Sequence, residues 1–426
     1  MKLAVIGGSA ASTPALFASP QLRAAARDLD VVLVGRSRRH LGAVARAIES
    51  AGDAECASVT TVDFDAAEMR MALRGCDAIL IQVRCGGYAG RARDEMFPLP
   101  FGIPGDEGIG PGGLSAAWRS WPPLCDILAT VKETCPRAVV LMMTSPVSLL
   151  VRCARTAFPE LRTVGICELP WTTLKEVCKT VGVDPGAVSF TYAGVNHLGW
   201  FGRIACGALD VVDAYKKHRT RAAFPSAQLI ESCQGIPLKY LRLHYERGDV
   251  VSEQRARLVS RGDELQQLQT HAYDVFEAGD REAMRRALDA RPTPWYEEAV
   301  GPLLGAMANR ATSTVPFFLS VPSRGALAGF GDDDILEIAH RFTGDDFERI
   351  ERSCDLPAET KGDLERFVRF ERAASRAVAA RDARALAGAL EDHPWVDSAA
   401  VASAIAAAIA DQDDEPVAAV RSTSST

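Results

Sequence analysis

Two short segments of the chain each offer one good metal ligand, and about thirty residues separate them. Cys167 lies in Gly165-Ile-Cys-Glu-Leu-Pro170, and His197 lies in Gly194-Val-Asn-His-Leu-Gly-Trp200. Thiolate sulfur and imidazole nitrogen bind divalent cations, and two protein ligands leave coordination positions open for a substrate. An isolated cysteine and histidine are more often structural residues of a core. Because each segment ends an apolar run, the pair nevertheless indicates metal-assisted chemistry at the edge of a sheet.

The elements that would position these ligands alternate between short apolar runs and helical stretches. Buried strands are predicted at residues 3–6, 30–34, 78–82, 138–143 and 163–166, and helices at residues 38–51 and 66–74. This alternation is typical of a doubly wound parallel sheet. The predicted fold class is therefore α/β, with a Rossmann-like sheet in the N-terminal part.

The rhythm of the sequence changes near residue 190. Longer helical stretches follow, with one further strand-like run at residues 317–321 and an alanine-rich helical region after residue 360. We expect a dinucleotide-binding domain over residues 1–190 and a mixed α+β, largely helical domain for substrate binding and oligomerisation over residues 191–413. Residues 414–426 are expected to form a disordered tail.

Length and composition narrow the class of protein. A chain of 426 residues with 47% hydrophobic residues is too long for one core and fits two domains. The net charge of −7 argues against nucleic acid as the main partner. No stretch approaches the roughly 20 apolar residues that a membrane helix needs, and the eleven scattered cysteines fit a reduced compartment. The composition predicts a soluble, cytoplasmic protein.

A glycine turn follows the first predicted strand. Gly7 and Gly8 would let the backbone approach a pyrophosphate, and Ser9 and Thr13 would lie beside it. The spacing departs from G-x-G-x-x-G, so a purely structural turn is an equal alternative from the motif alone. Its position between two predicted strands favours a dinucleotide site.

The second predicted strand ends in a basic run where NAD-binding chains usually carry an acidic residue. Gly35 stands in place of that acid, and Arg36, Ser37, Arg38 and Arg39 follow. These side chains offer the charge and the donors that a 2′-phosphate needs, which favours NADP over NAD. The alternative is a solvated basic start to the next helix.

A third candidate region follows the apolar run at residues 78–82. Arg84 lies at the expected carboxyl edge of the sheet, where ligands bind in such folds. It is either an anion-binding residue or the partner of a nearby carboxylate, and the local sequence favours the ion pair. The glycine-dense loop from Gly105 to Gly113 carries Asp106 and Glu107 and is too irregular to be a mere connector.

The order of these motifs resembles the family 4 glycoside hydrolases, the NAD- and divalent-metal-dependent 6-phosphoglucosidases, α-galactosidases and α-glucuronidases. The resemblance runs nearly end to end and rests on nine ordered landmarks: the glycine turn with Thr13-Pro14, Val83-Arg-Cys-Gly-Gly, Asp106-Glu to Gly113, Thr144-Ser-Pro146, Cys167-Glu-Leu-Pro170, Val195-Asn-His-Leu198, Pro237-Leu-Lys-Tyr-Leu241, Val321-Pro-Ser-Arg-Gly325 and His393-Pro. An ordered set is far more specific than any one motif.

The resemblance implies an oxidation and elimination mechanism in place of the two-carboxylate route of most glycosidases. The nicotinamide takes hydride from C3 of the sugar, a base removes the proton at C2, and the aglycone leaves C1. Water then adds, and the hydride returns to C3. A divalent ion, Mn²⁺ by analogy with the family, binds O2 and O3, and Cys167 and His197 match its two protein ligands.

The resemblance also implies a set of substrate-binding residues. Arg84 matches an arginine of the phospho-glucosidase branch and implies a C6 phosphate or another anionic handle. Asn196 would orient hydroxyl groups or the ligand histidine, with a turn-forming role as the alternative. Arg291 lies where the family carries an Arg-Gly-Gly segment, and Glu107 and Ser145 complete the set. Relatives are commonly homodimers or homotetramers, so the same is expected for this chain.

The chain departs from the family at several of these positions. Ser145 replaces the asparagine of Thr-Asn-Pro, and Glu168 replaces the Asp or Asn that follows the ligand cysteine. Glu168 can still serve as a general acid. The stretch that supplies the C2 base has lost its paired tyrosines, which leaves Tyr240, His244 and Tyr245 as the candidates.

Three functions therefore compete. The leading one is a glycosidase that acts on a phosphorylated or otherwise anionic glycoside. The second is a sugar oxidoreductase or epimerase that uses the same C3 oxidation without cleavage, which the changes at Glu168 and His244 motivate. The third is a degenerate, non-catalytic protein that binds nucleotide.

Overall fold

One large sheet contains most of the strands. The computed structural model describes residues 1–51, 56–221, 223–350 and 356–413, so the tail expected at residues 414–426 lies outside the described residues. The strands of this sheet are β1 (Lys2–Ile6), β2 (Asp30–Gly35), β3 (Ser58–Asp63), β4 (Ala78–Ile81), β5 (Val139–Met142), β6 (Arg162–Cys167), β11 (Phe317–Pro322), β12 (Ile335–Phe342) and β13 (Phe347–Arg349). Their order is β13-β12-β11-β6-β5-β4-β1-β2-β3.

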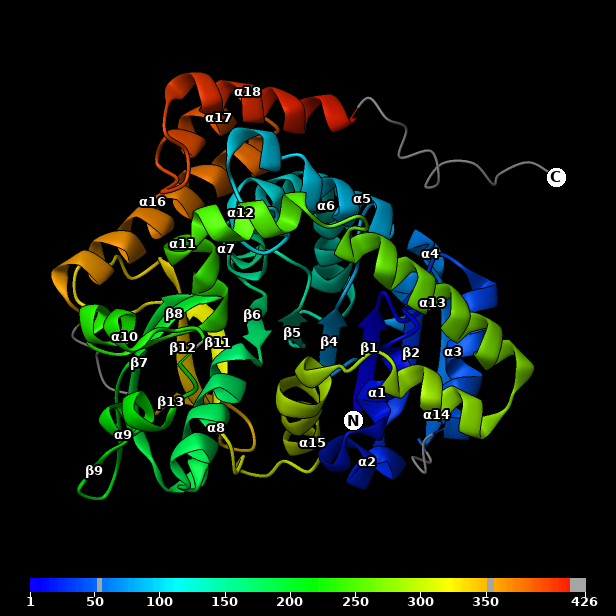
Figure 1. Ribbon diagram of the computed structural model, residues 1–426. Helices are drawn as coiled ribbons and strands as arrows, with labels where there is room; N and C mark the ends of the chain where they lie inside the picture. Colours follow the sequence, from blue (N-terminus) through cyan, green and yellow to red (C-terminus); the bar gives the residue numbers. More distant parts are fainter. Residues whose placement is uncertain (52–55, 222, 351–355, 414–426) are drawn as a thin grey trace.

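The strands from β3 to β6 are parallel and form the Rossmann-like part of the sheet (Figure 1). Their apolar side chains are buried on both faces, which is why they are recognisable as continuous apolar runs. The predicted strands and the α/β fold class are confirmed. The sequence pattern misses β3, because this edge strand exposes Ser58, Thr60 and Thr61.

Beyond β6 the sheet becomes antiparallel. β11 pairs with β6 so that Phe318 lies opposite Cys167, and β12 pairs with β11 so that Glu337 lies opposite Ser320. The strand predicted at residues 317–321 is confirmed, whereas β12 and β13 were not predicted. The division of the chain at residue 190 stays a prediction, and the large sheet draws strands from both sides of that position.

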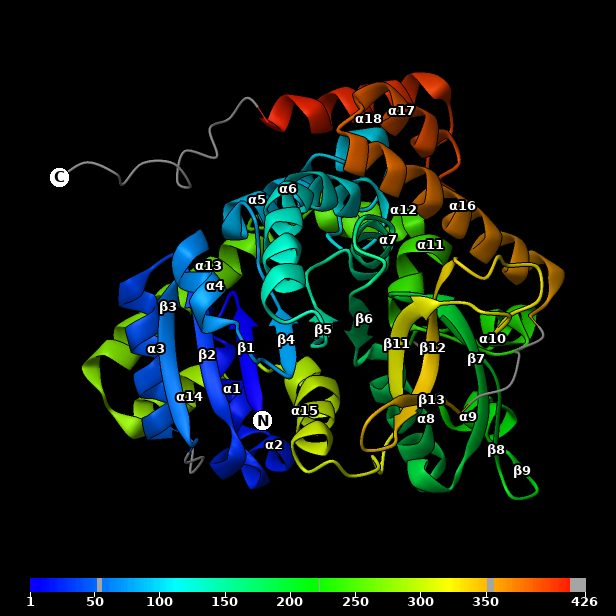
Figure 2. The ribbon, with the colours of Figure 1, turned by 180° about the vertical axis from the view of Figure 1, so that it is seen from behind.

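A smaller sheet lies beside β11 and β12 (Figures 1 and 2). It consists of β7 (Ser189–Val195), β8 (Leu198–Cys206), β9 (Leu209–Asp210) and β10 (Ile236–Pro237). The β7–β8 hairpin has a two-residue turn, Asn196 and His197, because Val195 pairs with Leu198. Ring contacts join Tyr192 of β7 to Phe318 of β11, so the hairpin is fixed against the large sheet.

Helices cover the sheet and complete a largely helical C-terminal part. Three of them, α16, α17 and α18, lie together at one end of the molecule, against α6 and α7 (Figure 1). None of the helices in the described ranges is long and apolar enough to cross a membrane. The helices predicted at residues 38–51 and 66–74 and after residue 360 are confirmed. The bounds are α1 (Thr13–Ala18), α2 (Pro20–Ala24), α3 (Arg38–Ala51), α4 (Ala66–Ala72), α5 (Gly87–Met96), α6 (Gly110–Thr134), α7 (Val147–Ala157), α8 (Leu169–Val181), α9 (Val211–His218), α10 (Ala227–Cys233), α11 (Arg242–Tyr245), α12 (Arg247–Arg255), α13 (Arg261–Ala278), α14 (Arg281–Asp289), α15 (Gly301–Ala308), α16 (Ala358–Ala380), α17 (Ala383–Glu391) and α18 (Ala399–Ala410).

Candidate active site

The turn after β1 is held closely between the neighbouring strands. The amides of Gly7 and Gly8 both donate to the Val34 carbonyl at 2.9 Å. Gly7 has a φ of 90°, and a Cβ there would lie 2.9 Å from the Gln82 carbonyl oxygen, so the position requires glycine. The Gln82 side chain donates to Thr13 Oγ1 at 3.0 Å. In folds of this type, a dinucleotide pyrophosphate lies at this first βα turn.

Two tyrosines from the second half of the chain stabilise this turn through hydrogen bonds. Tyr273 donates to the Ser9 carbonyl at 2.6 Å, and Tyr296 donates to the Gln82 side-chain oxygen at 2.6 Å. Burial raises the pKa of both phenols, so they remain protonated donors. The sequence analysis missed both tyrosines, because the contacts join segments that are more than 200 residues apart.

Packing explains why glycine stands at position 35, where an acidic residue is expected. A Cβ at this position would lie 2.7 Å from Ser9 Oγ, so the Ser9 side chain leaves no room for a carboxylate. The next residue, Arg36, lies close enough to Cys85 for its charge to act on that thiol. Ser37 Oγ accepts a hydrogen bond from the backbone amide at the first turn of α3, at 3.2 Å.

The two following arginines are engaged by carboxylates. Arg38 forms ion pairs with Asp63 and Glu68, and Arg39 contacts the Glu277 carboxylate through two N–O distances of 2.6 and 2.7 Å. Of the arginines predicted to face a 2′-phosphate, Arg36 alone makes no ion pair within the described part of the chain.

A buried carboxylate joins two arginines beyond the end of β4. Glu107 forms an ion pair with Arg84, and its Oε1 lies 2.8 Å from Arg91 Nη1. Burial opposes ionisation of Glu107, but the two guanidinium groups outweigh it and lower the pKa to about 2. Arg91 also pairs with Glu95 at 2.7 Å. The ion pair favoured for Arg84 is therefore present, and Arg91 is a residue of the site that the sequence analysis did not select.

Arg84 and Arg291 approach the same aromatic ring. Their guanidinium carbons lie 5.4 and 5.6 Å from the ring centroid of Tyr88, which is within the range of a cation–π contact. Arg291 also lies 5.6 Å from the ring centroid of Trp295, and no carboxylate pairs with it among the residues that the structure describes. Two predicted substrate-binding arginines are thus brought together.

Cys167 ends β6, and its sulfur is buried among polar groups. The Leu169 amide donates to the sulfur at 3.4 Å, and the Glu168 carboxyl lies 3.8 Å from it. Burial, followed by the carboxyl groups of Glu168 and Glu337, raises the pKa of the thiol. The Leu169 amide and the Asn196 side chain oppose that rise through hydrogen bonds to the sulfur.

His197 occupies the second position of the β7–β8 turn, with a φ of 68°. One face of its ring stacks on Tyr240 at a centroid distance of 4.3 Å. A Cβ on Gly108 would lie only 2.5 Å from His197 Nδ1, so the imidazole fits against a glycine of the Gly105–Gly113 loop. Burial lowers the pKa of His197 against the opposing charges of Glu168 and Glu107, which favours the neutral, metal-binding imidazole.

The Cys167 and His197 side chains fit a divalent cation. His197 Nδ1 is buried without a hydrogen-bond partner in the described structure, and the charge of Glu168 acts on both side chains. Within the described ranges, no group of three or more His, Cys, Asp or Glu residues is arranged to hold an ion. Such a site would consequently have two protein ligands and open positions for substrate oxygens.

Of the three base candidates, the structure brings one to this site. Tyr240 stacks on His197, and its pKa is raised by burial and then by Asp106 and Glu107. Asp106 accepts hydrogen bonds from the amides of Gly108 and Ile109 at 2.6 and 2.8 Å, and burial raises its pKa to about 6. The sequence analysis had noted Asp106 in its loop without assigning it a role.

The other two base candidates lie in a different environment. Both ring nitrogens of His244 are engaged, with Asp363 at 3.1 Å and with the Trp395 indole at 3.1 Å. The Tyr245 hydroxyl accepts from the Trp200 indole at 3.1 Å. These bonds fix both side chains in the packing between the hairpin sheet and the C-terminal helices, so Tyr240 is the base candidate that lies against His197.

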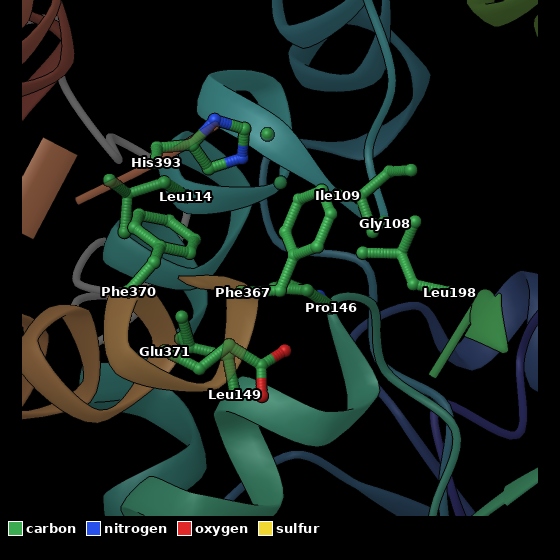
Figure 3. Close-up of a pocket in the computed structure, with 12 residues that line it drawn as sticks. Gly108, Ile109, Leu114, Pro146, Leu149, Leu198, Phe367, Phe370, Glu371 and His393 are labelled. Atoms are coloured by element: carbon green, nitrogen blue, oxygen red, sulfur yellow. The ribbon is translucent and has the colours of Figure 1, made fainter. Parts of the chain in front are cut away.

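Ser145 lies in the loop after β5, before Pro146. Pro146, Gly108 and Leu198 line a small cavity (Figure 3). Its other walls are mostly apolar, but the Glu371 carboxylate and the His393 ring also line it. The loops that carry Ser145, Gly108 and His197 therefore meet around one cavity.

This geometry defines a class of protein: a Rossmann-like fold whose sheet edge carries a buried cysteine and a buried histidine, both influenced by the charge of Glu168. The family is settled by two sequence models. The model of the family 4 glycosyl hydrolases matches residues 2–183, and the model of the family 4 glycosyl hydrolase C-terminal domain matches residues 192–396. The chain belongs to family 4 of the glycosyl hydrolases, as its motifs had indicated.

Similar proteins span nearly the whole chain. The "Probable 6-phospho-beta-glucosidase" of Bacillus subtilis is 24% identical over 95% of this chain and 94% of its own length. The 6-phospho-beta-glucosidase of Escherichia coli is 22% identical over 93% and 92%. A structure of the 6-phospho-beta glucosidase of Thermotoga maritima with manganese, NAD⁺ and glucose-6-phosphate has a TM-score of 0.84 at 20% identity, covering 97% of this chain and 98% of that one.

The left-handed backbone at His197 gives a stability prediction. We expect His197→Gly to be more stable than His197→Ala by about 1 kcal/mol, because glycine adopts this φ without a Cβ clash. Urea unfolding followed by circular dichroism measures the difference. Arg310, with a φ of 48°, is a matched control. Arg310→Gly should be more stable to urea than Arg310→Ala for the same reason. Equal stabilities for the two His197 variants would contradict the turn geometry.

Proposed function

We propose that this protein is a glycosidase that cleaves a 6-phosphorylated or otherwise anionic glycoside by oxidation at C3, deprotonation at C2 and elimination of the aglycone. The proposal is carried by the convergence of four side chains at the end of β6, where Glu168 lies beside Cys167 and Tyr240 stacks on His197. The nucleotide turn follows β1 at the same carboxyl edge of the sheet. Two relatives that match nearly the whole chain are named as 6-phospho-beta-glucosidases, which supports the substrate class.

Each residue has a distinct task in this proposal. A bound dinucleotide and a divalent ion, Mn²⁺ by analogy with the Thermotoga maritima structure, supply hydride acceptance and Lewis acidity. Cys167 and His197 would hold the ion. Tyr240 would take the proton from C2 as its phenolate, the form that a neighbouring cation would stabilise against burial, and Glu168 would protonate the leaving oxygen.

The substrate would be held by charge and by one amide. We assign the anionic group to Arg84 and Arg291, since both guanidinium groups contact Tyr88 and Arg291 makes no ion pair in the described structure. Asn196 Oδ1 is buried and lacks a hydrogen-bond partner within the described residues, so it would accept a hydrogen bond from a sugar hydroxyl. Glu107 would act by holding Arg84 and its loop in place.

The dinucleotide is proposed to be NADP rather than NAD. Ser9 packs where a ribose-binding acid would need room, and Arg36 makes no ion pair in the described ranges. Arg36 and Ser37 would then face the 2′-phosphate, whereas Arg38 and Arg39 are engaged by carboxylates.

Three broader expectations also stay proposals. These are an assembly of two or four copies, the division into a dinucleotide-binding part and a substrate-binding part near residue 190, and a cytoplasmic location. The small-molecule sugar substrate is the one partner that the proposed site itself requires.

The activity is tested with nitrophenyl 6-phosphoglucosides of both anomers, in the presence of Mn²⁺ and either dinucleotide. We expect release of nitrophenol without net NAD(P)H accumulation, because the hydride returns to C3. Cys167→Ser should lose at least tenfold in kcat/KM, whereas Cys178→Ser, a change of a buried cysteine in α8, should not. Net NAD(P)H formation without nitrophenol would instead establish the oxidoreductase alternative. If neither product forms with any phosphorylated or uronic substrate, the nucleotide-binding alternative gains.

Cofactor choice is tested by titrating the protein with NAD⁺ and with NADP⁺ and following intrinsic fluorescence. We expect tighter binding of NADP⁺, and a loss of about tenfold in that preference in Arg36→Ala, because one charge-assisted contact is removed. Arg39→Ala is the matched control, since Glu277 already engages Arg39, and its preference should be unchanged. Tighter binding of NAD⁺ by the wild type would contradict the proposal.

A further inference from the structure

A buried glutamate lies behind the metal-ligand pair, outside every motif of the sequence analysis. Glu337 is on β12, opposite Ser320, and its side chain is 1% exposed. A carboxyl in such a position is costly unless its oxygens receive hydrogen bonds. Both oxygens do: Oε2 accepts from the Tyr192 hydroxyl at 2.5 Å, and Oε1 accepts from Asn196 Nδ2 at 3.3 Å.

The neighbouring sequence is adapted to this contact. Tyr192 reaches Glu337 by passing over Gly199 on the adjacent strand, where an added Cβ would lie 2.0 Å from the tyrosine hydroxyl. Any side chain at Gly199 would therefore displace the hydroxyl. The carboxyl thus connects β12 of the large sheet to the β7–β8 hairpin that carries His197.

The Asn196 amide transmits this contact to the site. Its nitrogen donates to Glu337, and the next residue in the two-residue turn is His197. The nitrogen end of the amide therefore faces Glu337. Asn196 Oδ1 is consequently left as a buried acceptor without a partner in the described structure.

We infer that Glu337 is a positioning residue: through Asn196 it fixes the turn that presents His197 to the metal and keeps the Asn196 carbonyl oxygen available to a sugar hydroxyl. This inference rests on the proposed roles of Cys167 and His197 as metal ligands. Groups that hydrogen-bond to metal ligands fix their orientation, and their loss typically weakens metal binding 10- to 100-fold.

The test uses the full chain and Co²⁺, because a thiolate bound to Co²⁺ gives a charge-transfer absorption in the near ultraviolet. In Glu337→Met, which keeps the volume but removes both acceptors, we expect the Kd for Co²⁺ to rise about tenfold and the band to weaken. Glu337→Gln should retain the wild-type affinity for Co²⁺ and the wild-type band. Its side-chain carbonyl accepts from Asn196, and its amide nitrogen donates to the Tyr192 hydroxyl oxygen. Glu371→Met is the matched control, since Glu371 is another buried glutamate and contacts Ser148 instead.

Two further measurements separate positioning from general damage. In an Asn196→Ala background, Glu337→Met should have no additional effect on Co²⁺ binding, because the path runs through Asn196. If Glu337→Met does not fold, Tyr192→Phe is measured instead. We expect this variant also to weaken the charge-transfer band.

Four outcomes would overturn the inference. If Glu337→Met has an unchanged affinity for Co²⁺ and an unchanged band, the inference is wrong and the proposed function stays intact. Equal losses in the Met and Gln variants, or additive losses with Asn196→Ala, also do so. If the wild-type chain with Co²⁺ shows no such band, Cys167 is not a ligand of the ion, and both proposals are overturned.

Discussion

The candidate site depends on a two-residue turn that holds the backbone of His197 in the left-handed region. Gly108 packs against one side of the imidazole and the Tyr240 ring stacks on it, so the ring has little freedom. A non-glycine residue in this conformation costs roughly 1 kcal/mol or more. Because glycine would satisfy the turn better, histidine at this position is best explained by the chemistry of its side chain.

Three buried acids around this turn differ because their partners differ. Two guanidinium groups lower the pKa of Glu107 to about 2. Burial raises the pKa of Asp106 to about 6, against hydrogen bonds from two backbone amides and the charge of Arg91. Glu337, with a phenol and an amide as partners, has its pKa raised by burial to about 8. The site thus combines one firmly ionised carboxylate, balanced by arginines, with acids whose charge is more readily removed.

Much of this could be predicted from the sequence, and the rest could not for identifiable reasons. The parallel strands are recognisable because they are apolar on both faces, whereas β3 exposes polar residues at an edge. Cys167 and His197 are recognisable because each lies in a motif at the end of an apolar run, Cys167 as the last residue of β6 and His197 in the turn after β7. Tyr240 and His244 lie within one short stretch, and only the packing of that stretch separates them. Glu337 acts through contacts more than 140 residues away, which leave no local pattern.

The central claim is that the residues around His197 remove a proton from C2 of a sugar before the aglycone leaves. The most direct measurement is turnover of a 6-phosphoglucoside in D₂O with cofactor and Mn²⁺, followed by NMR of the released sugar phosphate. The account predicts deuterium at C2, because the proton lost there is replaced from solvent when water adds. Hydrolysis that leaves C2 fully protonated would contradict it.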